Sequence, residues 1–164
     1  MTVDFDASSF IKLANHPLKF RLFLLTKLPS AFFAGVRMRG IDGNKCAVSV
    51  PYKWFSQNPF RSTYFACLAM AGEMSTGALG LAYVYKRKPA ISMLVVSVHA
   101  DYQKKATGRT IFTCEDGALF KKMIEEAIET GESRTVAARS IGRNAAGEIV
   151  AEMVVTWSFK MRSR

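Results

Sequence analysis

Apolar and polar positions follow three different patterns along this chain, and each pattern predicts a different kind of element. Residues 148–160 alternate between apolar and polar side chains, which is typical of a β-strand with one buried face. Residues 117–130 repeat apolar side chains every three or four positions, which predicts an amphipathic helix that Gly131 ends. Residues 91–102 are apolar on both faces, so we expect this strand at the centre of a sheet.

The remaining strands are read from similar runs and from turn signals. A hairpin is predicted over residues 33–52, because Asp42 and Gly43 stand between two strand-like runs. Two further strands are expected at 109–114 and 134–143. The count is therefore about six antiparallel strands with helices segregated from them, which places the chain in the α+β class.

The N-terminal part is read as helical over residues 7–28, and Pro17 should split it into two helices. The second helix, LKFRLFLLTKL, is both apolar and basic. It either packs on the protein's own sheet or lies on a membrane surface. We expect one domain over residues 1–164, with a helical segment at 1–30 followed by a core at 31–160.

Composition and charge narrow the class of protein. Hydrophobic residues make up 49% and charged residues 22%, which is ordinary for a soluble globular protein. The net charge of +10 favours anionic partners, such as phosphorylated ligands, nucleic acid or an acidic membrane face. Three widely spaced cysteines favour reduced thiols over a metal site or disulfides, and residues 1–9 lack the pattern of a signal peptide. We therefore expect a cytoplasmic protein without a bound metal.

The segment from Ser62 to Tyr85 contains a single charged side chain, Glu73. It is long enough to span a membrane, but an acidic residue at the bilayer centre costs about 3 kcal/mol. A helix enclosed by strands fits better, because its many small residues would allow a close approach. In such an enclosure Glu73 is either a hydrogen-bonded structural residue or a carboxylate poised for acid–base chemistry.

This stretch resembles the central helix of the hotdog-fold acyl-CoA thioesterases, in particular the phenylacetate-pathway type. Those proteins carry an Asn, a His-Gly-Gly six residues later, and an acidic residue nine beyond the His. Here Asn58, Tyr64 and Glu73 keep that spacing. The His-Gly-Gly is replaced by Tyr64-Phe65-Ala66.

The resemblance is closer to a hotdog branch described only as a domain of unknown function. That branch shares the patterns N-P-F-x-S-x-Y and A-x-E-x-x-x-G, which here lie between Asn58 and Gly77. The likeness covers about residues 34–159. It implies an antiparallel sheet of about six strands wrapped around a central helix, with a helix before the last two strands. The extra N-terminal helices lie outside the likeness and are read from the residues alone.

The resemblance also implies a mechanism and an assembly. Backbone N–H groups of Phe65 and Ala66 would face the thioester oxygen, as helix starts can. Asn58 would orient a water, and Glu73 would activate that water or attack the carbonyl carbon. Expected pocket residues beside them are Thr63, Tyr64 and Met70. The sites would lie at the boundary of a homodimer, which could assemble further into a tetramer.

Basic residues fall at strand ends and turns, where they would either hold the phosphates of coenzyme A or form a solvated surface. The residues that carry this expectation are Lys86, Arg87, Lys88, Lys104, Lys105, Arg109, Arg134, Arg139 and Arg143. No cofactor is expected apart from coenzyme A as part of the substrate. Nucleic acid is disfavoured as a partner, because the aromatic residues mostly fall on apolar faces rather than between basic residues.

Three functions are open from the sequence. The leading one is hydrolysis of an acyl-CoA or related thioester. The second is non-catalytic binding of an acyl chain or acyl-CoA by the same fold. The third is a basic protein that binds nucleic acid or anionic membranes through residues 18–28 and the arginines, and it needs no pocket.

Overall fold

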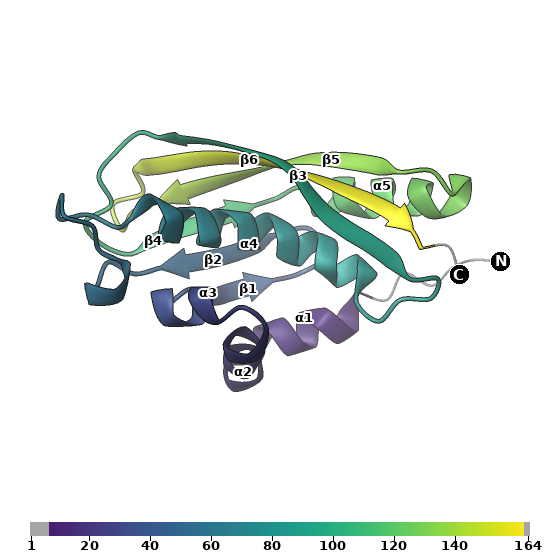
Figure 1. The fold of residues 1–164 in the computed structure, drawn as a ribbon, viewed down its shortest axis with the longest axis horizontal. Helices are drawn as coiled ribbons and strands as arrows, with labels where there is room; N and C mark the ends of the chain where they lie inside the picture. Colours follow the sequence, from purple (N-terminus) through teal and green to yellow (C-terminus); the bar gives the residue numbers. More distant parts are fainter. Residues whose placement is uncertain (1–6, 163–164) are drawn as a thin grey trace.

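A six-stranded antiparallel sheet wraps around one long helix in this protein (Figure 1). The computed structural model describes residues 7–162. Most of residues 1–9, from which we expect no signal peptide, therefore lie outside the described residues. The strands are β1 (Arg37–Ile41), β2 (Cys46–Val50), β3 (Ile91–Tyr102), β4 (Thr110–Cys114), β5 (Arg134–Arg143) and β6 (Ile149–Met161). Their spatial order is β1-β2-β4-β5-β6-β3. This is the α+β arrangement that the sequence predicts.

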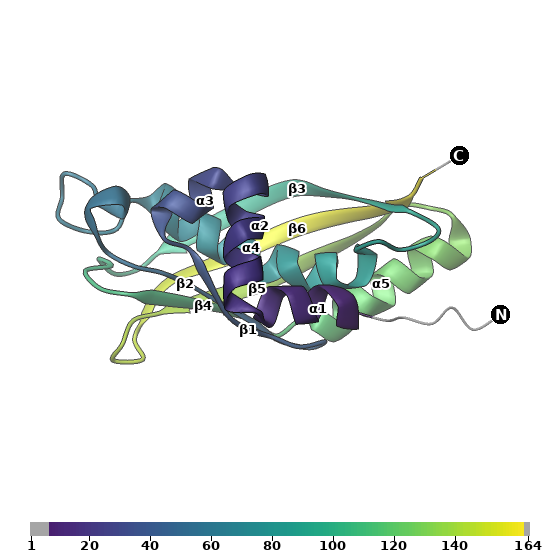
Figure 2. The same ribbon diagram turned by 90° about the horizontal axis from the view of Figure 1, so that it is seen from below.

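The long helix α4 (Phe65–Val84) lies between the sheet and a layer of shorter helices (Figures 1 and 2). That layer consists of α1 (Ser8–Asn15), α2 (Pro17–Lys27) and α3 (Pro29–Ala34). The helix α5 (Gly117–Thr130) precedes β5, and a short 3₁₀ turn η1 (Trp54–Ser56) follows β2. Both α4 and α1 contribute buried side chains to one continuous core.

Close contacts on several sides explain why α4 carries almost no charge. A side chain at Gly72 would collide with Met153, and a Cβ at Gly77 would stand 2.8 Å from the Trp157 ring. Only glycine allows β6 to approach this closely. By length and composition α4 could cross a membrane, but 61% of its most apolar stretch is buried inside the protein. The enclosed helix predicted from the sequence is therefore confirmed.

Most other predicted elements are confirmed to within a few residues. Pro17 opens α2 at its first position, and Gly131 ends α5 with a left-handed backbone (φ 71°). The hairpin turn is held by the Asp42 carboxylate, which accepts the N–H groups of Asn44 and Lys45 at 2.7 and 2.8 Å. The pattern does not predict α3, which begins at a proline just after the helical segment and runs into the expected hairpin.

The expectation that residues 91–102 form a central strand is wrong. Among the described strands β3 pairs with β6 alone, at the edge of the sheet. Its side chains Leu94, Val96 and Val98 are 68%, 58% and 49% exposed. A strand that is apolar on both faces is expected to be buried on both faces. The pattern does not say whether the burial comes from this chain or from another one. A long apolar edge also offers unpaired backbone groups to another strand.

A second expectation fails for some of the aromatic residues. Phe33, Trp54, Phe55 and Phe60 are 53%, 78%, 57% and 73% exposed. They do not fall on buried apolar faces, and Trp54 and Phe55 directly follow Lys53. Three of them lie in η1 and the loop after it, where no regular period predicts burial.

Candidate functional site

A hollow of about 680 Å³ lies at the start of α4. It is lined by the loop at residues 58–64 and the first turn of α4, and by the end of β3 and the turn at residues 103–106. Thr63 joins the two segments, because its N–H and its hydroxyl both donate to the carbonyl of Ala106, at 2.8 and 3.1 Å. The predicted residues Asn58, Tyr64 and Phe65 are therefore brought together in one place.

The Asn58 side chain is engaged with its own loop. Its Oδ1 accepts the N–H groups of Phe60 and Ser62 at 3.0 and 3.2 Å. Its Nδ2 donates to the Ser62 hydroxyl at 3.1 Å and to the carbonyl of Thr63 at 3.5 Å. In the single chain Asn58 thus shapes the loop that leads into α4, and its predicted role toward water stays a prediction.

The first backbone N–H groups of α4 are available as hydrogen-bond donors. Tyr64 precedes the helix, and its side chain does not cap it. Within residues 7–162 the N–H groups of Phe65 and Ala66 have no hydrogen-bond acceptor. Because a helix start also carries partial positive charge, an oxyanion placed there would be stabilised. The rings of Tyr64 and Phe65, 4.9 Å apart, stand beside these donors.

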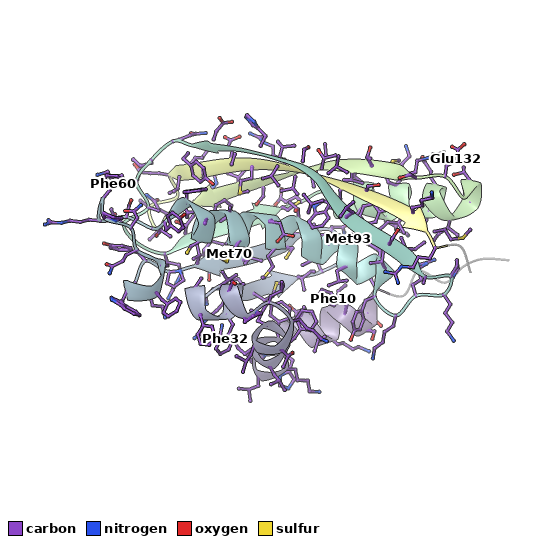
Figure 3. All side chains as sticks on the ribbon, in the orientation of Figure 1. Phe10, Phe32, Phe60, Met70, Met93 and Glu132 are labelled. Carbon is purple, nitrogen blue, oxygen red and sulfur yellow. The ribbon has the colours of Figure 1, made fainter. Side chains whose placement is uncertain are left out.

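Glu73 lies further along α4, on the wall of a second cavity of about 270 Å³. The other walls are mostly apolar and come from α1, α2, α4, β3 and β6. Figure 3 shows two wall residues, Phe10 and Met93, toward the C-terminal half of α4. Phe60, which belongs to the first hollow, lies at the opposite end of the helix.

The Glu73 carboxylate has no partner among the described residues, neither a hydrogen-bond donor nor a cation. Burial raises the pKa of Glu73 from 4.5 to about 6, because the charged form loses its water. Its backbone carbonyl accepts the Thr76 hydroxyl at 2.8 Å, but this bond does not involve the carboxylate. A carboxylate with a pKa near neutrality can take a proton from water and return it. The geometry therefore favours the poised carboxylate over the hydrogen-bonded structural one.

The two hollows are separate in a single chain. They share no lining residue within the described part of the protein. Eight residues of helix from Phe65 to Glu73 span about 12 Å. Reacting groups must approach to roughly 3 Å, so one thioester cannot use both sites on the same chain. Met70 packs against the core and lines neither hollow, unlike its expected neighbours Thr63 and Tyr64.

The basic residues expected to hold phosphates fall in different places. Arg139 and Arg143 line a hollow of about 470 Å³ together with Lys45. Arg134 is not among its lining residues and forms an ion pair with Glu132 at 2.9 Å. Side chains alternate along β5, so positions an odd number apart face opposite sides of the sheet. The second group, Lys86 to Lys88, follows the end of α4.

At these hollows the sequence predicts Lys105, as part of a basic pair expected to hold phosphate, but it does not predict Phe10 or Phe20. Lys105 lines the hollow at the start of α4, and its Nζ donates to the carbonyl of Phe60 at 3.4 Å. Phe10 and Phe20 bring α1 and α2 to the cavity of Glu73. The basic pair at Lys104-Lys105 is visible in the sequence, but the hollow that a turn faces depends on the strand order.

A long central helix wrapped by an antiparallel sheet defines the hotdog fold, and solved structures share it. One is a protein of unknown function and probable thioesterase from Pseudomonas aeruginosa, with a TM-score of 0.76, 18% identity, and 89% of this chain and 97% of that chain covered. A protein of unknown function from Chlorobaculum tepidum has a TM-score of 0.75 and 14% identity, with 91% and 99% covered. A thioesterase from Haemophilus influenzae has a TM-score of 0.61 and 10% identity, with 87% and 91% covered.

The chain belongs to the family described as Domain of unknown function (DUF4442), whose model matches residues 19–159. The predicted resemblance is therefore confirmed, and the match reaches further toward the N-terminus than expected, over most of α2 and all of α3. A comparison with curated proteins finds no match to this chain. At identities of 18% or less, the solved structures show the fold alone.

Proposed function

We propose that the protein is a homodimeric hydrolase of acyl-CoA or a related thioester. The observation that carries this proposal is the Glu73 carboxylate, which has no partner among the described residues and borders an apolar cavity. Its pKa, raised to about 6, suits a general base. The apolar walls suit an acyl chain, and the fold is shared with proteins named as thioesterases.

The proposed reaction uses one water. Glu73 removes a proton from the water while the water oxygen bonds to the carbonyl carbon of the thioester. The N–H groups of Phe65 and Ala66 stabilise the oxyanion that develops. The carbon–sulfur bond then breaks, and the leaving thiolate takes the proton from the Glu73 carboxylic acid. The products are a carboxylic acid and a free thiol, and Glu73 is again a carboxylate.

A second copy of the chain would supply what one chain lacks. The exposed edge of β3 suits antiparallel pairing with the same strand of another copy about a two-fold axis. Tyr102, at one end of β3, lines the hollow at the start of α4, whereas Met93, near the other end, lines the cavity of Glu73. Antiparallel pairing places the Tyr102 end of one β3 strand beside the Met93 end of the other. Each site would then join the α4 start of one copy to Glu73 of its partner.

Non-catalytic binding of acyl-CoA is the second candidate function. The observation that favours it is the group of aromatic rings at the α4 start, in place of His-Gly-Gly. The ring of Phe65 lies 4.9 Å from that of Tyr64 and 6.1 Å from that of Tyr102, and Phe65 is 56% exposed. These rings narrow the approach of a carbonyl oxygen to the N–H donors.

A panel of acyl-CoA esters of different chain lengths separates the two candidates. Release of free thiol is measured for each ester, beside the melting temperature with the ester and with free coenzyme A. Thiol release supports hydrolysis, and a raised melting temperature without thiol release supports binding. If no ester is cleaved and none raises the melting temperature, both candidates are contradicted.

A further inference from the structure

The helix α2 has apolar side chains on two opposite faces. Phe20 and Leu24 are buried toward α4 and the core. Leu18, Leu22 and Leu25 are 77%, 62% and 41% exposed, and their spacing places them on one outer face of the helix. A helix that only packs on its own protein needs one apolar stripe. The outer stripe of α2 therefore suggests a binding partner that buries it.

Aromatic side chains extend this outer stripe from α2 through α3 to η1. The Arg21 guanidinium of α2 stands 3.8 Å over the ring of Phe32. Ring contacts then run from Phe32 to Phe33 at 5.3 Å, to Phe55 at 5.8 Å and to Trp54 at 5.5 Å. Figure 2 shows α2 and α3 in front of α4, and Figure 3 shows Phe32 on that side of the molecule.

We call this surface the α2–η1 face. It consists of the exposed apolar side chains Leu18, Leu22, Leu25, Leu28, Phe33, Trp54 and Phe55. Its residues come from α2, α3, η1 and the residue between α2 and α3. The face lies outside both hollows apart from Leu28, which also lines the cavity of Glu73.

The part of the sequence that carries the α2–η1 face contains almost only basic residues among its charged ones. Residues 7–72 contain nine Lys and Arg but a single acidic residue, Asp42, whereas residues 73–164 contain fourteen basic and ten acidic residues. Arg37, Arg39, Lys53 and Arg109 line a hollow of about 290 Å³ beside the face. None of these four forms an ion pair within the described residues, and Lys53 directly precedes Trp54.

We propose that the α2–η1 face docks on an anionic phospholipid bilayer. Its leucines and aromatic rings would enter the boundary between headgroups and acyl chains, and the basic hollow would receive headgroup phosphates. A bilayer matches both properties of the face at once, because it offers apolar depth beneath a layer of negative charge. This docking is independent of the chemistry proposed for Glu73.

Other occupants match only one of these properties. A second copy related by a two-fold axis would set the same basic surface against itself, and like charges across an interface are costly. Nucleic acid would satisfy the arginines, but its hydrated phosphates would leave the leucines of α2 uncovered. The cavity of Glu73 lies directly behind the face, since Phe20 and Phe23 of α2 form part of its wall. Docking would therefore place that cavity next to the acyl chains of the bilayer.

Co-sedimentation of the full chain with vesicles tests the proposal. Vesicles of phosphatidylcholine alone are compared with vesicles of equal parts phosphatidylcholine and phosphatidylglycerol. We expect binding to the anionic vesicles only, weakened by added salt because surface charges are screened. The double variant Leu18→Ser/Leu22→Ser should lower binding by at least about tenfold, because two apolar side chains no longer insert.

Matched variants separate docking from general effects. Leu25→Ser should weaken binding, whereas Leu119→Ser on α5 should not, although the two leucines are 41% and 40% exposed. Arg37→Gln/Lys53→Gln should lower binding by about tenfold or more. Lys121→Gln/Lys122→Gln removes the same charge from α5 and should leave binding unchanged.

Three results would overturn the proposal. The first is absence of sedimentation with anionic vesicles while all variants stay folded. The second is equal loss of binding in the α5 controls, which would make the effect one of total charge. The third is lipid-free self-association, or binding to duplex DNA, that Leu18→Ser/Leu22→Ser abolishes in a protein that does not bind vesicles.

Discussion

The hollow at the start of α4 and the cavity of Glu73 differ in which polar groups they leave unsatisfied. In the first, Asn58 and Thr63 are fully engaged with the loop and turn, and the open groups are the N–H donors of Phe65 and Ala66. In the second, the open group is the Glu73 carboxylate, an acceptor without a donor among the described residues. One region offers donors and the other an acceptor.

On the proposed function, each of these regions is half of a site. Buried polar groups in proteins are usually hydrogen-bonded, so an unsatisfied group needs an explanation. Within α5, two half-buried acidic side chains do find partners, in the pairs Lys121–Glu125 and Lys122–Glu126. The unpartnered groups of α4 are complementary but about 12 Å apart along one helix. Two antiparallel copies of α4 would bring them together.

The largest expected effect comes from removing the acceptor. Glu73→Gln keeps the size of the side chain and should lower thioester hydrolysis by about a hundredfold or more, because the general base is lost. In the wild-type protein the rate should rise with pH through about 6, as Glu73 becomes a carboxylate. Glu129→Gln, at an exposed position of α5, is the control and should keep full activity. Turnover near the wild-type level in folded Glu73→Gln would exclude this role.

The next effect comes from mixing two inactive variants, one that lacks an N–H donor at the start of α4 and one that lacks the Glu73 carboxylate. Phe65→Pro removes one N–H donor at the first helical position, where proline is tolerated, and Phe65→Ala controls for loss of the ring. Neither Phe65→Pro nor Glu73→Gln alone should be active. After random subunit exchange, half of the dimers are mixed and each has one intact site, so about one quarter of wild-type activity should return.

This rescue distinguishes a shared site from one within a single chain. Mixed dimers are verified by mass spectrometry of the assembly, with Phe65→Ala in place of Phe65→Pro as a parallel sample. A solution monomer, or mixed dimers of folded variants that stay inactive, would show that the two regions do not form one site. The comparison between them would then need a different explanation.

Much of the fold could be predicted because the apolar positions of its periodic segments are buried by other parts of the same chain. The helix ending at Gly131 and the strand carrying Trp157 are cases of this kind, as is the enclosure of α4 around Gly72 and Gly77. The edge position of β3 could not be predicted, because an apolar pattern does not say whether the same chain or another one buries the side chains. The exposure of Trp54 could not either, because η1 is too short to show a period.

The candidate site could be predicted only in part. Glu73 stands out by its isolation in an uncharged segment, and its carboxylate has no partner among the described residues, but its catalytic role stays a prediction. Asn58 matches a family spacing, but its hydrogen bonds to the loop depend on where neighbouring backbone groups lie. The split of Arg134 from Arg139 follows from the odd spacing along β5 and was open to prediction. Lys105 belongs to a basic pair that the sequence marks, but which hollow it lines depends on the strand order, which local patterns do not contain.

A smaller effect concerns stability, and it tests whether Glu73 is truly unpartnered. Its pKa is 4.5 ordinarily and about 6 in the fold, so the folded state binds the proton more tightly than the unfolded chain does. Stability is therefore lost as the pH rises from about 4.5 to about 6, and the full cost, about 2 kcal/mol, persists above that range. Below pH 4.5 both states are protonated and the cost is absent.

Glu73→Gln should accordingly raise the free energy of unfolding by about 2 kcal/mol at pH 7.5 and change it little near pH 4. Denaturant unfolding across this pH range measures the difference. Glu129→Gln on the surface of α5 should stay within about 0.5 kcal/mol of wild type throughout. Destabilisation by Glu73→Gln at pH 7.5 would mean that the carboxylate has a donor, which would remove the contrast between the two hollows.

The smallest expected effect concerns the phosphates of coenzyme A. Lys105 lines the hollow at the α4 start and makes only a long hydrogen bond, 3.4 Å, to the carbonyl of Phe60. Arg134 and Arg139, by contrast, already pair with carboxylates. We expect free coenzyme A to raise the melting temperature and salt to reduce that rise. Lys105→Gln should weaken binding by no more than about fivefold, since an exposed charge contributes little.

Variants of the other basic groups decide which hollow receives the nucleotide end of coenzyme A. The pairs to compare with Lys105→Gln are Lys86→Gln/Lys88→Gln and Arg139→Gln/Arg143→Gln. If the α4 start holds the thioester, the single Lys105 change should weaken binding more than either pair. A larger loss from the arginine pair would move the phosphates to the hollow beside β5, away from the N–H donors. If all three variants bind coenzyme A like wild type, the positive charge serves another anion, and the vesicle experiment tests one such partner.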